Sequence, residues 1–166
     1  MTKPLTADRR VIVKHLLAIV LGAAALALTL GAAQAQDAET IIKARQAHMR
    51  LNSFNLGPLG AMAKGEIPYD AAVASAAAGN LAALAAMDQG RLWAKGTGQP
   101  ENDGTRALAA IWESSDDFAT KIEGLANATA ALADAAGTDL AALQVGMGEV
   151  GKACSACHKT FRAEKK

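Results

Sequence analysis

Apolar residues recur every three or four positions through the C-terminal part of the chain. Thr138 is a suitable N-cap for a helix, and the apolar positions that follow are Leu140, Leu143, Met147, Val150, Cys154, Cys157 and Phe161. Their spacings alternate between three and four residues, which is typical of a helix that buries one continuous seam. We therefore predict a helix that begins after Thr138 and continues through Phe161.

The preceding segment carries the same spacing. Its inward positions are Leu108, Ile111, Ser115, Phe118, Ile122, Leu125, Thr129 and Leu132. We predict one helix over these residues that ends near 135–137, where Gly137 can stop it. Two helices with such seams pack nearly parallel or antiparallel to each other.

Two further helices are predicted nearer the N-terminus. One begins at Pro68, a residue that the first turn of a helix accepts, and runs through Met87, with many alanines that allow close helix approach. The helix before it has the inward stripe Ile42, Arg45, Met49, Asn52, Leu56 and Leu59. Two members of this stripe are polar, which indicates a polar group beneath it. We expect Gly57-Pro58 to kink or end this first helix, because proline removes a backbone hydrogen bond.

The connections between these segments predict their order in space. Short connections join the first helix to the second and the third to the fourth, whereas the connection over 88–104 is longer. This pattern favours an all-α fold, an antiparallel up-down-up-down four-helix bundle. The composition agrees, because alanine and leucine dominate, 4% of residues are aromatic and only four are proline. A chain of 166 residues is expected to form one domain.

The first 35 residues have the features of a cleaved secretory signal. Its positive charges are Lys3, Arg9, Arg10 and Lys14. The apolar run over 16–30 is followed at 33–35 by Ala-Gln-Ala, a small-x-small cleavage pattern. That run is shorter than the roughly 20 residues that a membrane-spanning helix needs. We expect cleavage after Ala35, export to the periplasm, and no membrane span in the remaining domain over 36–166.

The charge of the chain bears on its partners. The formal net charge is +1, and it becomes −2 when the first 35 residues are removed. A protein that grips a phosphate backbone needs a basic surface. No run of basic residues supplies one, so we exclude nucleic acid as a partner.

The chemistry is concentrated where the only two cysteines, Cys154 and Cys157, are followed directly by His158. Cys-x-x-Cys-His is the signature of covalent c-type haem attachment. Two thiols one helical turn apart can add to the two vinyl groups of one porphyrin, and the next residue presents an imidazole to the iron. We predict one covalently attached haem c with iron. Because this haem is assembled after export, Arg9-Arg10 is interpreted as signal charge rather than as a twin-arginine signal.

Other roles for these residues remain open. A disulfide is permitted in an exported protein. A thioredoxin-like redox pair belongs to a βαβ context, which the pattern does not predict. A zinc site needs further ligands, and beyond residue 35 only His48 and His158 remain as histidines. Both cysteines lie on the predicted core seam, which favours a buried macrocycle over an exposed thiol pair.

With His158 as the proximal ligand, the other side of the iron decides the function. A distal methionine gives a low-spin electron carrier, whereas an empty position lets a small gas bind. The candidates are Met49, Met62, Met87, Met147 and His48.

Their positions in the predicted helices separate these candidates. Met147 shares the haem-bearing helix, and Met62 and Met87 lie near helix ends, so these three fit core positions better. Met49 lies mid-helix on the inward stripe, with a polar residue one turn to either side. His48 is expected to point toward an edge, and a bis-histidine site remains an alternative.

The sequence over 154–162, Cys-Ser-Ala-Cys-His-Lys-Thr-Phe-Arg, resembles class II cytochromes c, which include the cytochromes c'. Class I cytochromes c instead carry this motif near the N-terminus. The resemblance covers residues 37–166 and includes Arg45-Gln46, the connection over 63–70 and Ile111-Trp112. It implies the same four-helix bundle with one covalently bound haem.

The resemblance also implies roles for single residues. In this family the residue four positions after the first-helix arginine faces the iron, and here that residue is Met49. It is usually apolar and non-ligating in gas-binding cytochromes c', and it is a methionine ligand in the low-spin branch. The segments over 49–52 and 59–66 look more like the low-spin branch, which implies His158 and Met49 as axial ligands.

Two arginines gain roles by the same resemblance. Arg45 is placed near a haem propionate, where a guanidinium makes charge-assisted hydrogen bonds. Arg162 is placed one turn after His158, near the proximal face. The interruption at Gly57-Pro58 departs from the family pattern, in which this stretch is often helical.

We therefore expect a periplasmic monohaem electron carrier, not an enzyme, that exchanges single electrons with redox protein partners. The alternative is a five-coordinate haem protein that binds nitric oxide or carbon monoxide. A third class, a peroxidase-like enzyme, has only His48 as a visible distal acid-base group. Family members often form homodimers through the first two helices, and the alanine-rich second helix permits this.

Overall fold

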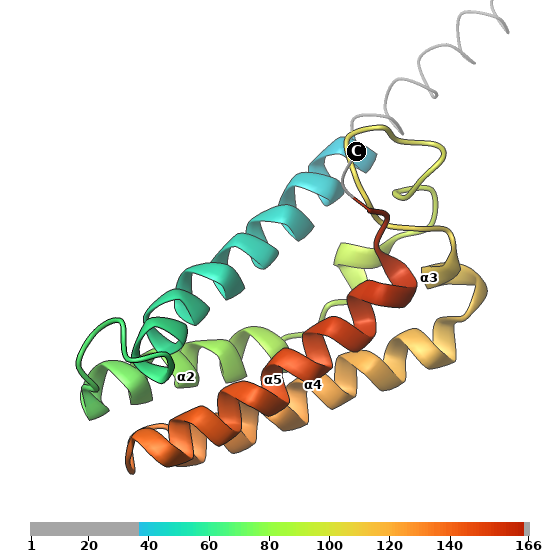
Figure 1. The fold of residues 1–166 in the computed structure, drawn as a ribbon. Coiled ribbons are helices and arrows are strands. Elements are labelled where there is room, and N and C mark those ends of the chain that lie inside the picture. Colours follow the sequence, from blue (N-terminus) through green and yellow to red (C-terminus); the bar gives the residue numbers. More distant parts are fainter. Residues whose placement is uncertain (1–36, 165–166) are drawn as a thin grey trace, which may run out of the picture. The chain divides into compact units, whose positions relative to one another are not determined.

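The computed structural model describes residues 37–164, which form an all-helical bundle (Figure 1). An N-terminal helix covers 37–63 of the described residues. It is followed by α2 (Ala71–Ala86), a short 3-10 helix η1 (Gly90–Trp93), the single-turn α3 (Ala110–Glu113), α4 (Ser115–Ala135) and α5 (Leu140–Phe161). The predicted all-α four-helix bundle is confirmed.

The predicted export signal and the predicted absence of a membrane span concern different parts of the chain. The expected signal over 1–35 lies outside the described residues. Over 37–164, no helix combines the length and the apolar character that crossing a membrane requires.

The start of α2 is set by Asp70. Its side chain accepts hydrogen bonds from the backbone N–H groups of Ala72 and Val73, at 2.9 and 3.0 Å. This satisfies two donors that a helix leaves unpaired in its first turn. The predicted start at Pro68 is therefore wrong, because the capping carboxylate stands two residues later.

The third helix is broken where the periodicity predicts continuity. Residue Ser114 leaves the helical conformation, with φ −123° and ψ 53°, and separates α3 from α4. The first turn of α4 then carries Asp116 and Asp117, whose charges are favourable at a helix N-terminus. The prediction of one helix from Leu108 is wrong for this reason, and Ser115, predicted to face inward, is exposed.

The last helix is capped by Asp139 rather than by Thr138 as predicted. The Asp139 carboxylate accepts from the backbone N–H of Ala142 at 2.8 Å. The predicted seam is confirmed at Leu143, Val150 and Phe161, which are buried.

The N-terminal helix continues through Gly57-Pro58 to residue 63. Of the two expected effects of this pair, a kink or an end of the helix, the end is wrong. Proline in a helix interior costs about 3 kcal/mol, but Leu59 and Met62, which follow it, are almost fully buried. Their burial offsets that cost. The helix stops before Gly65, which has a positive φ of 75°.

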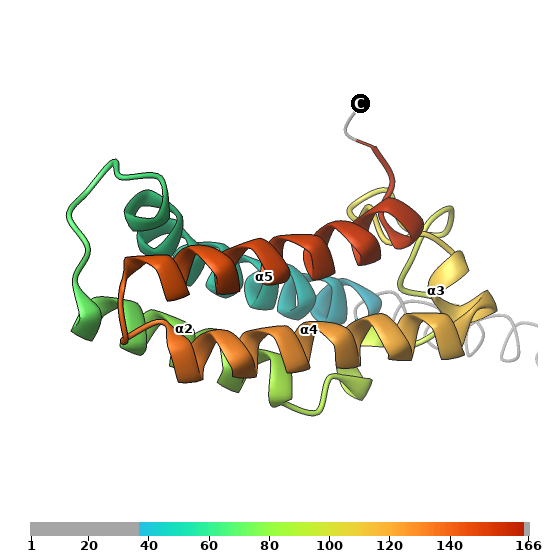
Figure 2. The same ribbon diagram turned by 60° about the horizontal axis from the view of Figure 1, so that its bottom comes forward.

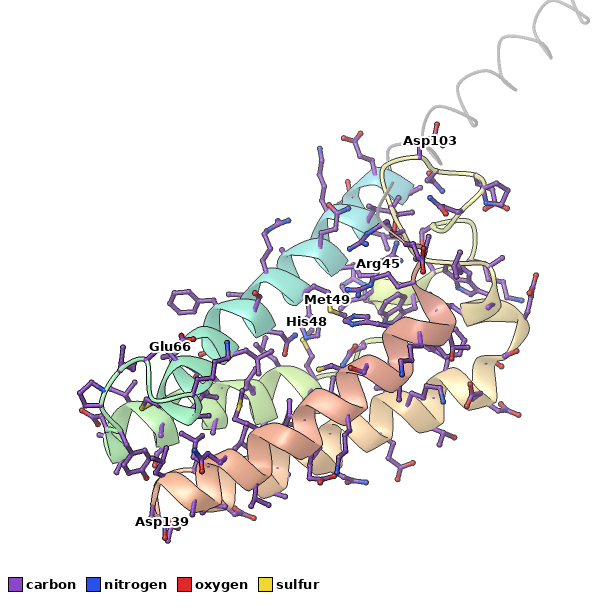
Figure 3. The ribbon with its side chains drawn as sticks, in the orientation of Figure 1. Arg45, His48, Met49, Glu66, Asp103 and Asp139 are labelled. Carbon is purple, nitrogen blue, oxygen red and sulfur yellow. The ribbon has the colours of Figure 1, made fainter. Side chains whose placement is uncertain are left out.

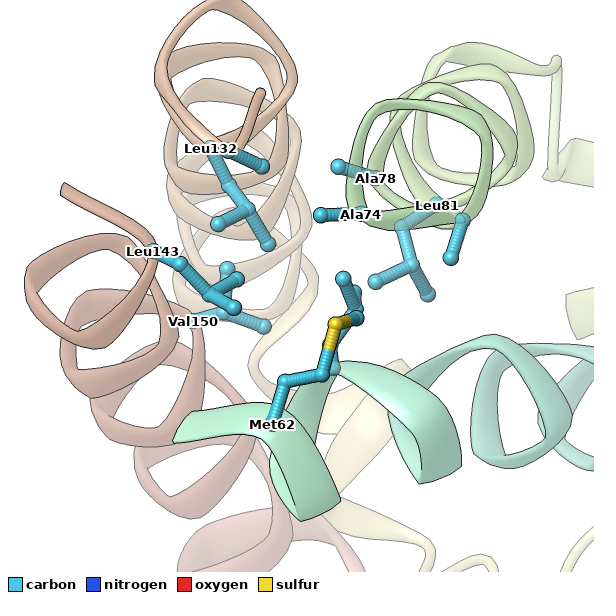
Figure 4. Close-up of a cluster of buried hydrophobic side chains, with 10 residues drawn as sticks. Met62, Ala74, Ala78, Leu81, Leu132, Leu143 and Val150 are labelled. Carbon is cyan, nitrogen blue, oxygen red and sulfur yellow. The ribbon is translucent and has the colours of Figure 1, made fainter. Parts of the chain in front are cut away.

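The bundle interior is divided into two groups of buried side chains. The main cluster joins the N-terminal helix to α2, α4 and α5 through Leu59, Met62, Ala74, Ala77, Ala78, Leu81, Leu132, Ala136, Leu143 and Val150 (Figure 4). The aromatic cluster consists of Ala107, Ile111, Phe118 and Phe161, with Trp93 packed against it. Cys154 packs against the main cluster, whereas Cys157 packs against the aromatic cluster.

The long connection before α3 returns to the end of α5 (Figure 2). The Leu108 N–H donates to the Phe161 carbonyl at 3.0 Å, and the Ala163 N–H donates to the Arg106 carbonyl at 2.8 Å. Ala107 and Arg162 form an isolated antiparallel bridge between these segments. The connection is therefore tied to the residues that directly follow the Cys-x-x-Cys-His motif.

Candidate functional site

The Cys-x-x-Cys-His motif lies on the last two turns of α5. Cys154 and Cys157 are free thiols, both partly buried, and His158 is partly buried beside them. Burial is the main cause that raises the pKa of both thiols. The two cysteines contact different clusters, so a macrocycle joined to both would lie where the interior is divided.

The surroundings of His158 favour its neutral form. Burial lowers the pKa of its imidazole, and the nearby positive charges of Arg162 and Arg106 lower it further. Only the neutral imidazole has a free ring nitrogen for a metal ion. The surroundings of His158 therefore favour the form that can ligate iron.

The N-terminal helix carries Arg45, His48 and Met49, which Figure 3 labels on its inward side. Arg45 reaches the connection that contains Thr97 and Thr105, and His48 reaches the Leu84 carbonyl of α2. Met49 is partly buried, and it is a member of neither described cluster. Met49 therefore differs from Met62 and Met147, which belong to or pack against the main cluster.

His48 is buried, with 6% of its surface exposed, so the expectation that it points toward an edge is wrong. Its Nε2 atom lies 3.0 Å from the Leu84 carbonyl oxygen, at the end of α2. This hydrogen bond turns the ring toward α2 and uses the nitrogen that iron most often binds. Its Nδ1 atom is buried without a hydrogen-bond partner in the described part of the chain.

The other methionines have structural roles. Met62 is 1% exposed, and its sulfur accepts a hydrogen bond from the Asp70 N–H at 3.3 Å. Met147 packs against the main cluster. Both predicted core positions are confirmed. Met87 was expected in the core, but it caps the end of α2 and is 43% exposed.

Arg45 is buried and its guanidinium makes four hydrogen bonds. It is 4% exposed, and its Nη1 donates to the Leu92 carbonyl at 3.1 Å and to Thr97 Oγ1 at 3.2 Å. Its Nη2 donates to the Thr97 carbonyl at 2.8 Å and to Thr105 Oγ1 at 3.0 Å. Burial lowers the pKa of the guanidinium, which still stays protonated at neutral pH.

Trp93 lies under this guanidinium, with 4.8 Å between the Arg45 Cζ atom and the ring centroid. Its indole Nε1–H is buried and has no hydrogen-bond partner among the described residues. No carboxylate forms an ion pair with Arg45 among the ion pairs of the described chain. A buried cation and an unpaired N–H donor in contact with it are suited to an anionic group such as a haem propionate.

Arg162 directly follows the last residue of α5. It is exposed and follows α5 as its C-cap, and its backbone N–H donates to the His158 carbonyl at 3.2 Å. The structure thus places Arg162 beside His158 and Arg45 beside Trp93, while the motif cysteines lie between the two clusters. The donor set and the unpaired Trp93 N–H together fit a haem attached at Cys154 and Cys157.

The sequence interpretation missed Trp93, Thr97 and Thr105. The two threonines lie 52 and 60 positions after Arg45, in an irregular connection without periodicity. The one available signal was Trp93, an aromatic residue in a stretch of mostly polar residues and glycine.

Comparison with known proteins places the chain in a family. The family model described as Cytochrome C' matches residues 40–162. The chain belongs to the cytochrome c' family. Members carry covalently bound haem c with iron, and Cys154 and Cys157 supply the thiols of the Cys-x-x-Cys-His motif.

Several relatives match along nearly their whole length. The chain is 50% identical over 145 residues to a cytochrome c-554 of Cereibacter sphaeroides, covering 83% of this chain and 95% of that protein. A solved cytochrome c' from Rhodobacter spheriodes is 43% identical, covers 77% of this chain and 98% of its own, and has a TM-score of 0.76. A nitric oxide complex of a cytochrome c prime variant from Alcaligenes xylosoxidans is 30% identical, with coverages of 76% and 97% and a TM-score of 0.68.

These findings correct the expected function. The electron carrier with His158 and Met49 as axial ligands is wrong, because the chain matches cytochromes c', whose haem is typically five-coordinate and binds nitric oxide or carbon monoxide. The coarser conclusion, that the chain is a class II cytochrome c with one haem, is confirmed. Proteins of this family are electron-transfer or gas-binding haemoproteins rather than typical enzymes.

Proposed function

We propose that this chain is a periplasmic cytochrome c' whose five-coordinate haem binds nitric oxide or carbon monoxide. The match to the cytochrome c' family over 40–162 carries the proposal. The nitric oxide complex of a relative with the same fold supports the choice of ligand. In this assignment residues 1–35 are removed on export and 36–166 form the haem domain.

The residues of the site have distinct tasks in this proposal. Cys154 and Cys157 fix the porphyrin by thioether bonds, and His158 supplies the neutral imidazole that ligates the iron. The positive charge of Arg45 would attract a propionate, and the free Trp93 N–H would donate to it. Arg162 keeps a positive charge beside His158.

In this proposal the N-terminal helix covers the distal face of the haem, the face opposite His158. Haem iron supplies a reversible binding position for a diatomic gas. Met49 lies on the inward side of this helix and limits the space above that position with an apolar side chain. The protein binds and releases its ligand, and no residue in this assignment turns over a substrate.

Optical spectra of the haem-loaded protein test this proposal. We expect a high-spin ferrous spectrum that shifts when carbon monoxide is added. Met49→Leu changes the carbon monoxide association rate and leaves the spin state unchanged, because it alters only the space above the iron. The control is Met147→Leu, which affects a methionine packed against the main cluster. A low-spin parent spectrum that ignores carbon monoxide and becomes high-spin in Met49→Leu would overturn the proposal.

The haem would supply a one-electron redox centre as well as a gas-binding position. We propose that a redox protein partner would exchange single electrons with it. The family supports this partner class, because its members are electron-transfer or gas-binding haemoproteins.

We further propose that two copies associate through the N-terminal helix and α2. An apolar groove runs between these helices, lined by Leu51, Phe54, Asn55, Asn80, Ala83, Leu84 and Met87. Phe54 is 77% exposed and Leu51 is 51% exposed beside it. A two-fold contact would bring each Phe54 to the same surface of its partner, which is how isologous interfaces are built.

A further inference from the structure

The connection between α2 and α3, which contains η1, is bonded to two other parts of the bundle. Arg45 of the N-terminal helix donates hydrogen bonds to Leu92, Thr97 and Thr105 of this connection. Arg106 and Leu108 pair with the backbone at the end of α5. We name Arg45, Leu92, Thr97 and Thr105 the Arg45 network.

The acceptors of the Arg45 network are enclosed by the protein. Thr97 is 2% exposed and Thr105 is 6% exposed. A buried cation is stable only when its N–H donors are satisfied, and here both terminal nitrogens of the guanidinium are bonded to one connection. Gln46 also reaches this connection, through a 2.8 Å bond to the Gly104 carbonyl, but that bond is exposed to solvent.

A continuous set of ring contacts leads from Arg45 to the haem-binding helix. The guanidinium lies over Trp93. The Trp93 ring meets Phe118 edge to face at a centroid distance of 4.8 Å, and Phe118 meets Phe161 in the same way at 5.2 Å. Phe161 is three residues after His158. The position of Trp93 therefore influences the packing at the C-terminal end of α5, which carries His158.

We propose that Arg45 is a positioning residue. Through its hydrogen bonds to Thr97 and Thr105 it holds the connection closed, that is, packed against the N-terminal helix, and so fixes the spacing between this helix and α5. This spacing sets the access of a small gas to the distal face beside Met49. The gas-binding part of the inference rests on the proposed function. The part about the connection does not rest on it, because the contacts of the Arg45 network involve protein residues only.

The test removes the acceptors and leaves Arg45 in place for a propionate. In the haem-loaded protein, Thr97→Val with Thr105→Val deletes two acceptors of the guanidinium and keeps the side-chain volume. Arg45→Lys is the second variant, since it keeps the charge and loses the planar fork. Thr129→Val is the matched control, because Thr129 is 1% exposed and its hydroxyl bonds only to carbonyls of its own helix, at Leu125 and Ala126.

Two readouts are measured well below the melting temperature. The first is the rate of tryptic cleavage after Lys95, an exposed residue in the connection. The second is the carbon monoxide association rate after flash photolysis. We expect both rates to rise several-fold in the Thr97/Thr105 variant and in Arg45→Lys, and to stay at the parent value in Thr129→Val.

The outcomes separate this inference from the proposed function. Cleavage and association rates in both network variants that equal those of Thr129→Val would overturn the inference. A parent that binds no carbon monoxide would overturn the proposed function. The cleavage rate after Lys95 would then still test whether the Arg45 network holds the connection closed. Faster cleavage in the network variants would support it, and unchanged cleavage would overturn it.

Discussion

The Asn80 side-chain amide donates a 3.0 Å hydrogen bond to the Asn55 side-chain oxygen, and this bond joins α2 to the N-terminal helix. Asn55 is only 6% exposed, and its own amide donates to the Leu51 carbonyl at 2.9 Å. The pair lies among the residues that line the apolar groove. A satisfied polar pair there fixes how the two helices meet, and it leaves the apolar side chains around it free for a second copy.

Phe54→Asp is expected to convert the proposed dimer to a monomer. A charged side chain at the centre of an apolar contact loses its hydration without gaining a partner, so we expect the dissociation constant to rise at least about tenfold. Sedimentation at micromolar concentration measures this. Val145→Asp is the control, because Val145 is 70% exposed on α5, away from the groove. A parent that sediments as a monomer contradicts the prediction.

Replacing the motif cysteines one at a time is expected to weaken haem attachment stepwise. Cys154→Ala and Cys157→Ala each retain one thioether, so the haem stays bound but its reduced pyridine spectrum moves toward that of a haem with one free vinyl group. The double variant releases its haem into acidified organic solvent. Ser155→Ala, at the exposed position between the cysteines, should behave as the parent does. Covalent haem in the double variant would refute this assignment.

Leu143→Ala is expected to be strongly destabilising. Leu143 has no exposed surface and belongs to the main cluster, and truncation of such a leucine costs about 2 to 5 kcal/mol through lost transfer energy and a cavity. Chemical denaturation of the haem-loaded protein measures the loss. Val145→Ala, two residues later and 70% exposed, should change the unfolding free energy by no more than about 0.5 kcal/mol. Equal effects of the two changes would disprove the burial argument.

Asp70→Ala is expected to lower stability by about 1 kcal/mol, because two N–H groups at the start of α2 lose their acceptor. Asp70→Asn is the control, since asparagine caps helices about as well as aspartate. Thermal unfolding of both variants checks the prediction. If both variants melt at the same lower temperature, the carboxylate acts by its charge rather than as a cap.

The faces of α4 and α5 could be predicted from the sequence because helical geometry repeats locally. A side chain every three or four residues returns to the same side, so Phe118, Leu132, Leu143 and Val150 are buried as expected. Helix ends were harder to predict. Ser115, which directly follows the break at Ser114, lies on the predicted hydrophobic spacing, so the spacing gives no sign of an interruption. At Pro58 tertiary burial outweighs the local preference of proline.

Some residues of the site are adjacent in sequence, whereas others meet only in the folded chain. Cys154, Cys157 and His158 are adjacent in sequence, so their common chemistry could be identified directly. The partners of Arg45 could not, because Thr97 and Thr105 reach it across more than 50 residues and no local pattern marks them. The axial partner of the iron was misjudged because one methionine on an inward stripe fits a ligand and a pocket wall equally well.

The division of the interior into two clusters has a consequence for biogenesis. The main cluster draws on four helices and needs neither Cys157 nor the aromatic residues, so it can form while the far end of the bundle is still open. Cooperative units of this kind open and close at different free energies. We expect the end that contains Trp93, Phe118 and Phe161 to stay accessible until the porphyrin is joined to the chain. Maturation would then finish the fold, and the newly exported chain would remain vulnerable to periplasmic proteases at that end alone.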